Sequence, residues 1–279
     1  MIGQHPEIYG VPELNLFVTD TLEEFINTFG GYRQIQQHGL LRTVAQLYAG
    51  EQSILSVDMA RRWMMRRRDW NVAQVYKELA QTVSPLRIAD KSPVYGGSAE
   101  TLARIRDAFP DAYYLHLLRH PVSQGKSILN IGKGIMAVMA DSIDYSTEPP
   151  TIDPQIMWYD MQKNILKFLQ DIPESQKMTM RGEDFLNDRD ANLKRLCDWL
   201  KIADDARAME AMLHPEDSPY ACLGPIGAHL GNDINFLQSP SLREAEISSP
   251  ELTVPLPWRP DNKPLRQAVI QMAREFGYN

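Results

Sequence analysis

Cysteine is scarce in this sequence, in which Cys197 and Cys222 are the only two among 279 residues. Two thiols are too few for the disulfide framework of a small secreted domain, and neither stands in the CxxC or HxxxH spacing typical of zinc sites. We therefore predict two reduced, buried cysteines and no metal site. No stretch approaches the ~20 apolar residues of a membrane span, and no basic segment followed by an apolar run opens the chain. These absences predict a cytoplasmic protein with no membrane partner.

The sequence also has no excess of positively charged residues. Lys and Arg total 29 against 36 Asp and Glu, which gives a net charge of −7. This balance argues against a nucleic acid partner held by bulk charge, although a local basic pocket still suits an anionic small molecule. With 43% hydrophobic and 23% charged residues, the composition is that of a folded globular protein. We predict one domain over residues 1–279.

Helical and strand-like patterns alternate along the chain. Asp153 and Pro154 are typical of a helix cap and first turn, and the apolar residues after them recur at helical spacing. Strand-like runs occur at 113–118 and 177–180. Further helix patterns run from Ser98 to Phe109, from Leu193 to Leu200 and from Pro264 to Phe276. This alternation predicts an α/β fold with a mainly parallel sheet, whose ligand sites lie at the carboxyl ends of its strands.

Residues 19–83 differ from the rest because their pattern is almost entirely helical. They include a basic and aromatic run at 61–68 that contains Arg66, Arg67 and Arg68. We expect this region to form a helical lid or side lobe. The charged run is either a solvated helix face or a docking surface for an acidic partner.

The residues that follow the 113–118 strand are of types that bind an anion. Arg119 comes directly after it, and Ser127 lies eight residues further on, near the start of the next helix. A guanidinium group, a hydroxyl and helix N-terminal amides can converge on one phosphate. The alternative is a surface salt bridge and a structural cap. Upstream, Lys91 follows another strand end and would reach the same edge of the sheet.

Taken in order, short phrases of this chain resemble the sulfotransferases that use 3′-phosphoadenosine 5′-phosphosulfate. The later part is most similar to the bacterial branch found in polyketide and olefin synthases. The phrases are His5-Pro6 with Pro12-Glu13-Leu14, Asp90-Lys91-Ser92-Pro93, Phe109-Pro110-Asp111-Ala112, Leu118-Arg119-His120-Pro121 with Ser127, Arg181-Gly182-Glu183-Asp184, and His214-Pro215-Glu216-Asp217-Ser218-Pro219 with Gly224-Pro225, Gly231-Asn232-Asp233 and Phe236-Leu237.

The resemblance implies a P-loop-type three-layer sandwich with a parallel central sheet, and transfer of a sulfuryl group to an alcohol. It implies that Arg119 and Ser127 hold the 3′-phosphate of the cofactor. It also implies that Lys91 stabilises charge on the leaving oxygen, the alternative being an exposed strand-end lysine. The acceptor would be a hydroxylated small molecule or a β-hydroxyacyl chain on a carrier protein.

Sulfuryl transfer also needs a base, because an alcohol is a poor nucleophile while it keeps its proton. Two residues qualify. Glu13 matches the position of a catalytic glutamate in some family members; alternatively, its carboxylate contacts backbone amides at a helix start. His214 precedes a proline and is the residue type that titrates near neutrality; alternatively, it only orders its loop.

The sequence departs from the family pattern at two places. Gly182 stands where an aromatic residue commonly contacts the adenine, so base stacking would come from elsewhere. Only Met1–Gln4 precede His5, where relatives have a strand and an Arg-Ser-Gly-type loop that cradles the 5′-phosphosulfate. We expect that Met1 is not the natural start, or that the chain closes the gap or pairs its open sheet edge as a homodimer. The alternative to a working enzyme is a catalytically inactive binding module with the same fold.

Overall fold

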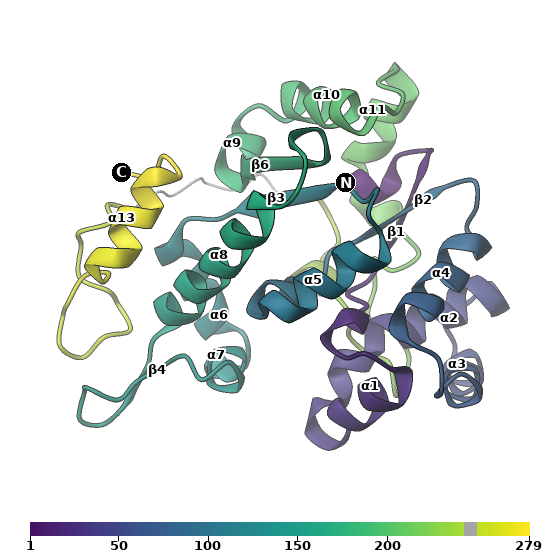
Figure 1. Ribbon diagram of the computed structural model, residues 1–279, viewed down its shortest axis with the longest axis horizontal. Coiled ribbons are helices and arrows are strands. Elements are labelled where there is room, and N and C mark those ends of the chain that lie inside the picture. The colour runs from purple at the N-terminus through teal and green to yellow at the C-terminus, as the bar shows by residue number, and fades with distance from the viewer. Residues whose placement is uncertain (243–249) are drawn as a thin grey trace. The chain divides into compact units, whose positions relative to one another are not determined.

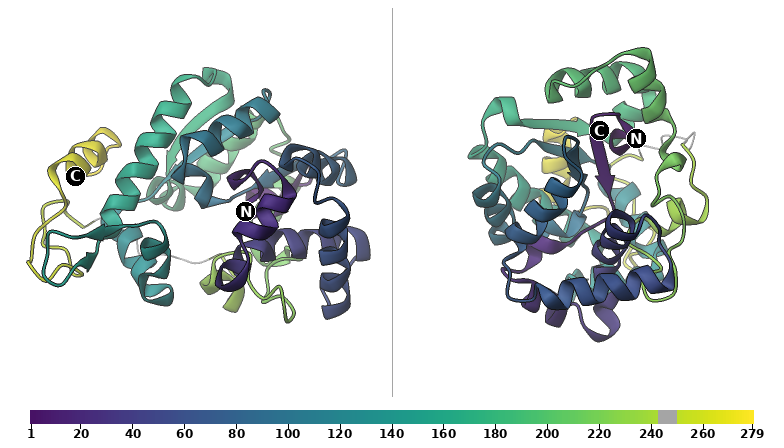
Figure 2. Two further views of the ribbon diagram at one scale, coloured as in Figure 1. Left: turned by 60° about the horizontal axis from the view of Figure 1, so that its bottom comes forward. Right: turned by 90° about the vertical axis from the view of Figure 1, so that its right-hand side faces the viewer.

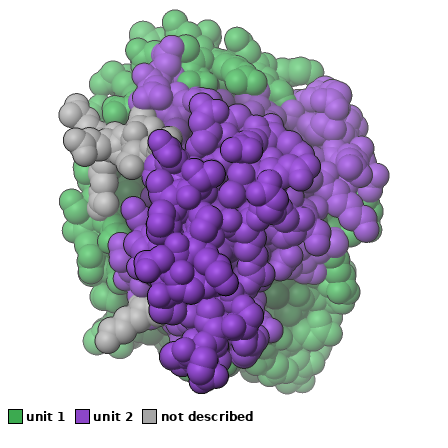
Figure 3. All heavy atoms as spheres, turned by 90° about the vertical axis from the view of Figure 1, so that its left-hand side faces the viewer, with its two compact units in different colours: residues 1–95, 100–110, 189–244 green, residues 96–99, 111–188, 245–279 purple. Residues whose placement is uncertain are grey.

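The structure is a computed structural model that describes residues 1–242 and 250–279. Within these ranges the chain divides into two compact units. One contains Met1–Tyr95, Glu100–Pro110 and Arg189–Glu244, and the other contains Gly96–Ala99, Asp111–Asp188 and Ala245–Asn279 (Figure 3). The sequence predicts a single domain.

Two parallel strands form the sheet of the first unit. β1 (Ile8–Val11) pairs with β2 (Arg87–Asp90), in a register that places Val11 opposite Asp90. Because the strands are parallel, their carboxyl ends lie at the same edge of the pair. Glu13 and Lys91 follow these two ends within two residues.

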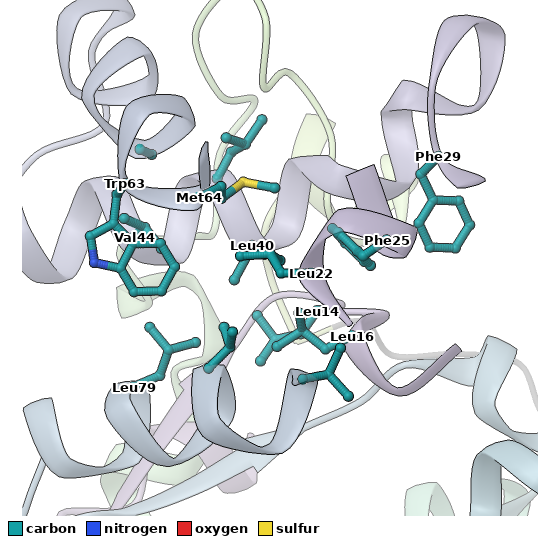
Figure 4. Close-up of a cluster of buried hydrophobic side chains, with 14 of the residues drawn as sticks. Leu14, Leu16, Leu22, Phe25, Phe29, Leu40, Val44, Trp63, Met64 and Leu79 are labelled. Atoms are coloured by element: carbon teal, nitrogen blue, oxygen red, sulfur yellow. The ribbon is translucent and has the colours of Figure 1, made fainter. Parts of the chain in front are cut away.

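Between β1 and β2 the chain is almost entirely helical. Its elements are η2 (Leu16–Val18), α1 (Leu22–Thr28), η3 (Gly31–Gln37), α2 (His38–Ala49), α3 (Ile54–Arg66) and α4 (Val72–Thr82), and α1 to α4 gather together in Figures 1 and 2. Thr21, Ser53 and Asn71 begin α1, α3 and α4 with capping boxes. The apolar faces of these helices share one core, which includes Leu14, Leu22, Phe25, Leu40 and Leu79 (Figure 4).

Later parts of the chain complete the first unit. They form α10 (Arg189–Leu200), α11 (Ala206–Leu213), η7 (Pro215–Asp217) and α12 (Ile234–Gln238). The amino-terminal η1 (Ile2–Gln4) also belongs to this unit. η4 (Pro93–Gly97) and α5 (Ala99–Ala108) contain residues of both units.

The second unit contains another parallel pair. β3 (Tyr114–Leu118) pairs with β6 (Lys177–Arg181), and Leu118 lies opposite Arg181. The other elements are α6 (Pro121–Asn130), η5 (Gly132–Gly134), α7 (Ile135–Met139), the antiparallel strands β4 (Ile143–Asp144) and β5 (Thr151–Ile152), α8 (Pro154–Gln170), η6 (Glu174–Gln176), α9 (Gly182–Asn187) and α13 (Gln267–Glu275). Trp158 of α8 and Val269 of α13 belong to the core of this unit.

The predicted α/β fold with parallel strands is confirmed. The strands at 114–118 and 177–181 and the helix at 154–170 lie where their patterns place them. Two details differ: the last helix begins at Gln267 instead of Pro264, and the parallel strands of the described residues form two separate pairs. Among the residues that the structure describes, no helix is long and apolar enough to cross a membrane.

Two local predictions are wrong. Asp153 stands at the N-cap of α8 but does not cap it, because its carboxylate accepts hydrogen bonds from Trp258 and Arg259 instead. Both cysteines are free thiols, but only Cys197 is buried, whereas Cys222 is exposed. The partners in each case come from distant segments, which local sequence patterns do not reveal.

Candidate functional site

Glu13 and Lys91 meet at the carboxyl edge of the β1–β2 pair. The Lys91 Nζ donates to Glu13 Oε1 over 2.6 Å. The Lys91 side chain is 63% exposed and the Glu13 side chain 25% exposed, so one side of the ion pair faces solvent. An exposed ion pair contributes little to stability. Both charges therefore remain available to a bound molecule.

The backbone at Glu13 is fixed by segments that are distant in sequence. Its N–H donates to the Gly231 carbonyl over 2.8 Å. Gly39, the second residue of α2, lies so close that a Cβ on it would be 2.0 Å from the Glu13 carbonyl oxygen. Gly231 has a φ of 110°, which favours glycine. Glycine at both positions therefore allows α2 and the 224–231 loop to approach Glu13.

His214 lies elsewhere in the first unit. It follows α11, and its ring nitrogens contact Glu216 at 2.9 Å and Glu210 at 3.1 Å. Hydrogen bonds to Glu216 and Glu210 raise the pKa of His214. The Gln4 side-chain amide, which precedes β1, donates to the His214 carbonyl. His214 thus lies toward the amino end of β1, whereas Glu13 follows its carboxyl end.

Arg119 directly follows β3, at the carboxyl edge of the β3–β6 pair. Its side chain is exposed, and no ion pair or side-chain hydrogen bond joins it to a described residue. The Trp158 indole donates to the Arg119 carbonyl over 3.1 Å and fixes the backbone there. Buried His120 then begins α6, where its Nδ1 accepts from the Val122 N–H. Ser127 is partly exposed and lies on the second turn of that helix.

The C-terminal residues close over the phrase at 181–184. The Arg181 guanidinium donates to both carboxylate oxygens of Asp184, over 2.6 and 2.7 Å. The Tyr278 hydroxyl donates to Glu183 Oε2 over 2.9 Å, and its ring centre is 5.4 Å from the Arg181 guanidinium carbon. Burial raises the pKa of Tyr278, so its hydroxyl keeps the proton that it donates. An aromatic ring therefore lies beside the phrase in which Gly182 replaces one. Sequence reasoning missed Tyr278 because it lies 95 residues beyond Glu183.

The candidate residues thus fall into two chemically distinct sets. In the first unit, Glu13 offers a proton acceptor and Lys91 a cation. In the second unit, Arg119 and Ser127 offer donors that suit a phosphate. Parallel strands followed by such side chains are typical of α/β proteins that bind an anionic ligand at the carboxyl ends of their strands.

The chain belongs to the sulfotransferase family, whose family model matches residues 1–206. It is accordingly a sulfotransferase-type enzyme.

Two solved structures are similar to it across the full chain. The sulfotransferase domain from the curacin biosynthetic pathway is 22% identical, is covered over 91% of its own chain and has a TM-score of 0.77. The sulfotransferase domain from the Synechococcus PCC 7002 olefin synthase is 23% identical, is covered over 88% of its own chain and has a TM-score of 0.72. Among curated protein sequences, none matches the chain. At these identities the two structures support the fold.

Proposed function

We propose that this protein transfers a sulfuryl group from 3′-phosphoadenosine 5′-phosphosulfate to a hydroxyl acceptor. The observation that carries the proposal is the Glu13–Lys91 ion pair at a parallel strand edge, in a member of the sulfotransferase family. Ligand sites of parallel sheets lie at this edge. When bound, the nucleotide supplies an activated sulfuryl group.

Arg119 and Ser127 would hold the 3′-phosphate of the nucleotide. The residues fit that group, because an exposed guanidinium that no described carboxylate neutralises suits a doubly charged anion. The Ser127 hydroxyl adds a neutral donor on the following helix. The buried His120 and the Trp158 hydrogen bond keep the backbone beside Arg119 in place.

Glu13 would accept the proton of the acceptor hydroxyl, and Lys91 would stabilise negative charge on the oxygen that leaves. The 2.6 Å contact of the Lys91 Nζ with the Glu13 Oε1 supports a shared site for these two groups. His214 contacts two glutamates at the other end of β1, so the geometry favours Glu13 as the base.

Binding of adenosine 3′,5′-bisphosphate tests the nucleotide site by calorimetry. We expect Arg119→Ala to weaken its binding about 10- to 100-fold and to leave adenosine 5′-monophosphate nearly unaffected, since a charge-assisted hydrogen bond is worth about 1.5–3 kcal/mol. Lys167→Ala, which removes an exposed cation from α8, serves as the control and should change neither affinity. Equal weakening of both nucleotides would make Arg119 structural, and no binding to the wild type would reject the nucleotide site.

The acceptor in this proposal is the hydroxyl of a small molecule or of a β-hydroxyacyl chain on a carrier protein. A mixed apolar and basic face of α3 supports the carrier. Leu55 is 80% exposed and Met65 52% exposed, and Arg66 and Arg62 are exposed as well, although Arg62 pairs with exposed Asp58 one turn earlier. Arg67 is not part of this face, because it donates to both carboxylate oxygens of Glu78. An acidic partner with apolar side chains would complement the α3 face.

Charge reversal on α3 tests the carrier. We expect Arg62→Glu with Arg66→Glu to slow association with a carrier-bound acceptor about tenfold, and added salt to reduce the wild-type rate similarly. Turnover of the same acyl chain as a free thioester should stay unchanged. The matched control is Lys194→Glu with Arg195→Glu on α10, an equal charge change on the same unit. Equal slowing with both acceptors, or by the control pair, would remove the carrier from the proposal.

A further inference from the structure

The two neighbours of Lys91 bind the segment that follows Glu13. The Ser92 hydroxyl accepts from the Asn15 N–H over 3.1 Å and donates to Asp90 Oδ1 over 2.6 Å. The same Asp90 oxygen accepts from the Leu14 N–H over 3.4 Å. Lys91 reaches Glu13 between these contacts. The two chain segments are therefore joined on both sides of the ion pair.

Further hydrogen bonds stabilise this junction between residues 13–15 and residues 90–92. Asp90 Oδ2 accepts from the Tyr95 hydroxyl over 2.9 Å. Asn15 has a φ of 56°, a left-handed conformation that asparagine tolerates, and its side-chain amide donates to the carbonyl and to Oε1 of Gln36. Ser92 is only 7% exposed, so water does not readily replace Asn15 and Asp90 as the hydrogen-bond partners of its hydroxyl.

The charged state of Asp90 affects the junction. Dense packing around the carboxyl group raises the pKa of Asp90 to about 6, against the hydrogen bonds from Ser92 and Tyr95. Glu13 also faces it, Lys91 adjoins it, and the rings of Tyr76 and Tyr95 pack near it. The carboxylate is thus ionised above about pH 6, where it accepts all three hydrogen bonds, and is increasingly protonated below.

We propose that Asp90 and Ser92 are positioning residues that hold the Glu13 carboxylate and the Lys91 ammonium in the arrangement that sulfuryl transfer requires. The inference rests on the proposed function. Neither residue exchanges protons with the acceptor. Their effect is to fix where the Glu13 oxygen and the Lys91 nitrogen stand when substrates bind.

Steady-state kinetics of three serine variants test this role. We expect Ser92→Ala to lower kcat about tenfold while the KM for the nucleotide changes less than twofold. Ser92→Thr should restore most of the rate, because it returns the hydroxyl. Ser56→Ala is the matched control: Ser56 is also buried, and its hydroxyl also makes hydrogen bonds, in this case with the backbone and the hydroxyl of Ser53 in the α3 capping box. A role confined to stability would make Ser92→Ala and Ser56→Ala alike in kcat, and that result would overturn the proposal.

Chemical labelling separates this proposal from the proposed function. Acetic anhydride acylates exposed amines, and mass spectrometry gives the rate at Lys91 relative to exposed Lys194. We expect Ser92→Ala and Asp90→Asn to raise that relative rate at least threefold. In these variants Glu13 is less firmly positioned, so its carboxylate spends less time hydrogen-bonded to the Lys91 nitrogen. If the wild type transfers no sulfate but the labelling rate responds, the proposed function fails and the positioning role stands. An unchanged labelling rate in both variants would contradict the positioning role whether or not sulfate is transferred.

Discussion

Glu13→Gln is expected to lower sulfate turnover about 10²–10⁴-fold with nucleotide affinity retained. The amide keeps the size of the side chain and its hydrogen bond with Lys91, but it cannot accept the proton of the acceptor hydroxyl. Initial rates and calorimetric affinities of the same preparation measure the two effects separately.

His214→Ala provides the comparison, because His214 is the second base that the sequence suggests. Its ring contacts Glu210 and Glu216 rather than the Glu13 pair, so we expect a change of less than threefold. A large loss in His214→Ala with full activity in Glu13→Gln would reverse the assignment. Retained activity in both variants would reject both residues.

Arg259→Met is expected to lower the free energy of unfolding of the second unit by about 3–5 kcal/mol. The Arg259 side chain is only 4% exposed and contacts Asp144, Asp153 and Asp261. Asp144 and Asp153 are buried themselves, so removal of the guanidinium takes the ion pair from Asp153 and leaves Asp144 with the half-exposed Arg266. Urea unfolding monitored by tryptophan fluorescence measures the loss.

The loss should depend on pH in a definite direction. Hydrogen bonds from Ser146 and Arg259 lower the pKa of Asp144, so its contribution to stability is present above the ordinary carboxyl pKa and is lost as pH falls through the lowered value. The difference between wild type and Arg259→Met should therefore shrink at acidic pH. Lys163→Met, which removes an exposed pair with Asp160 in the same unit, should cost at most about 1 kcal/mol. A similar cost for both variants would show that the Arg259 contacts are not desolvated.

Local patterns predict the elements of this fold well, because each strand and helix follows its own apolar spacing. The 114–118 strand and α8 are examples. Local patterns also predict that Lys91 and Arg119 each follow the carboxyl end of a strand. Glu13 and Lys91 are 78 positions apart, and their contact depends on the pairing of β1 with β2, which the spacing of residues does not predict.

The wrong or missing predictions share a physical cause. Asp153 has the sequence position of a helix cap, but Arg259 offers it a charged partner more than 100 residues away. The habit of free cysteines predicts a buried Cys222, yet Cys222 is exposed, and the buried Arg42 donates to its sulfur. The Ser92 hydroxyl also accepts from the Asn15 N–H, and the Tyr278 hydroxyl donates to Glu183; both contacts join segments that are distant in sequence, so local patterns do not indicate them.

Transfer of sulfur-35 from labelled 3′-phosphoadenosine 5′-phosphosulfate tests whether this protein moves a sulfuryl group to a hydroxyl. The purified chain is incubated with a β-hydroxyacyl thioester, free and carrier-bound, and with Glu13→Gln as the control. We predict labelled sulfate ester on the acceptor, an equal amount of adenosine 3′,5′-bisphosphate, and at least 100-fold less of both products with the variant. Tight nucleotide binding with no label on either acceptor would contradict it and would indicate a binding module with the sulfotransferase fold.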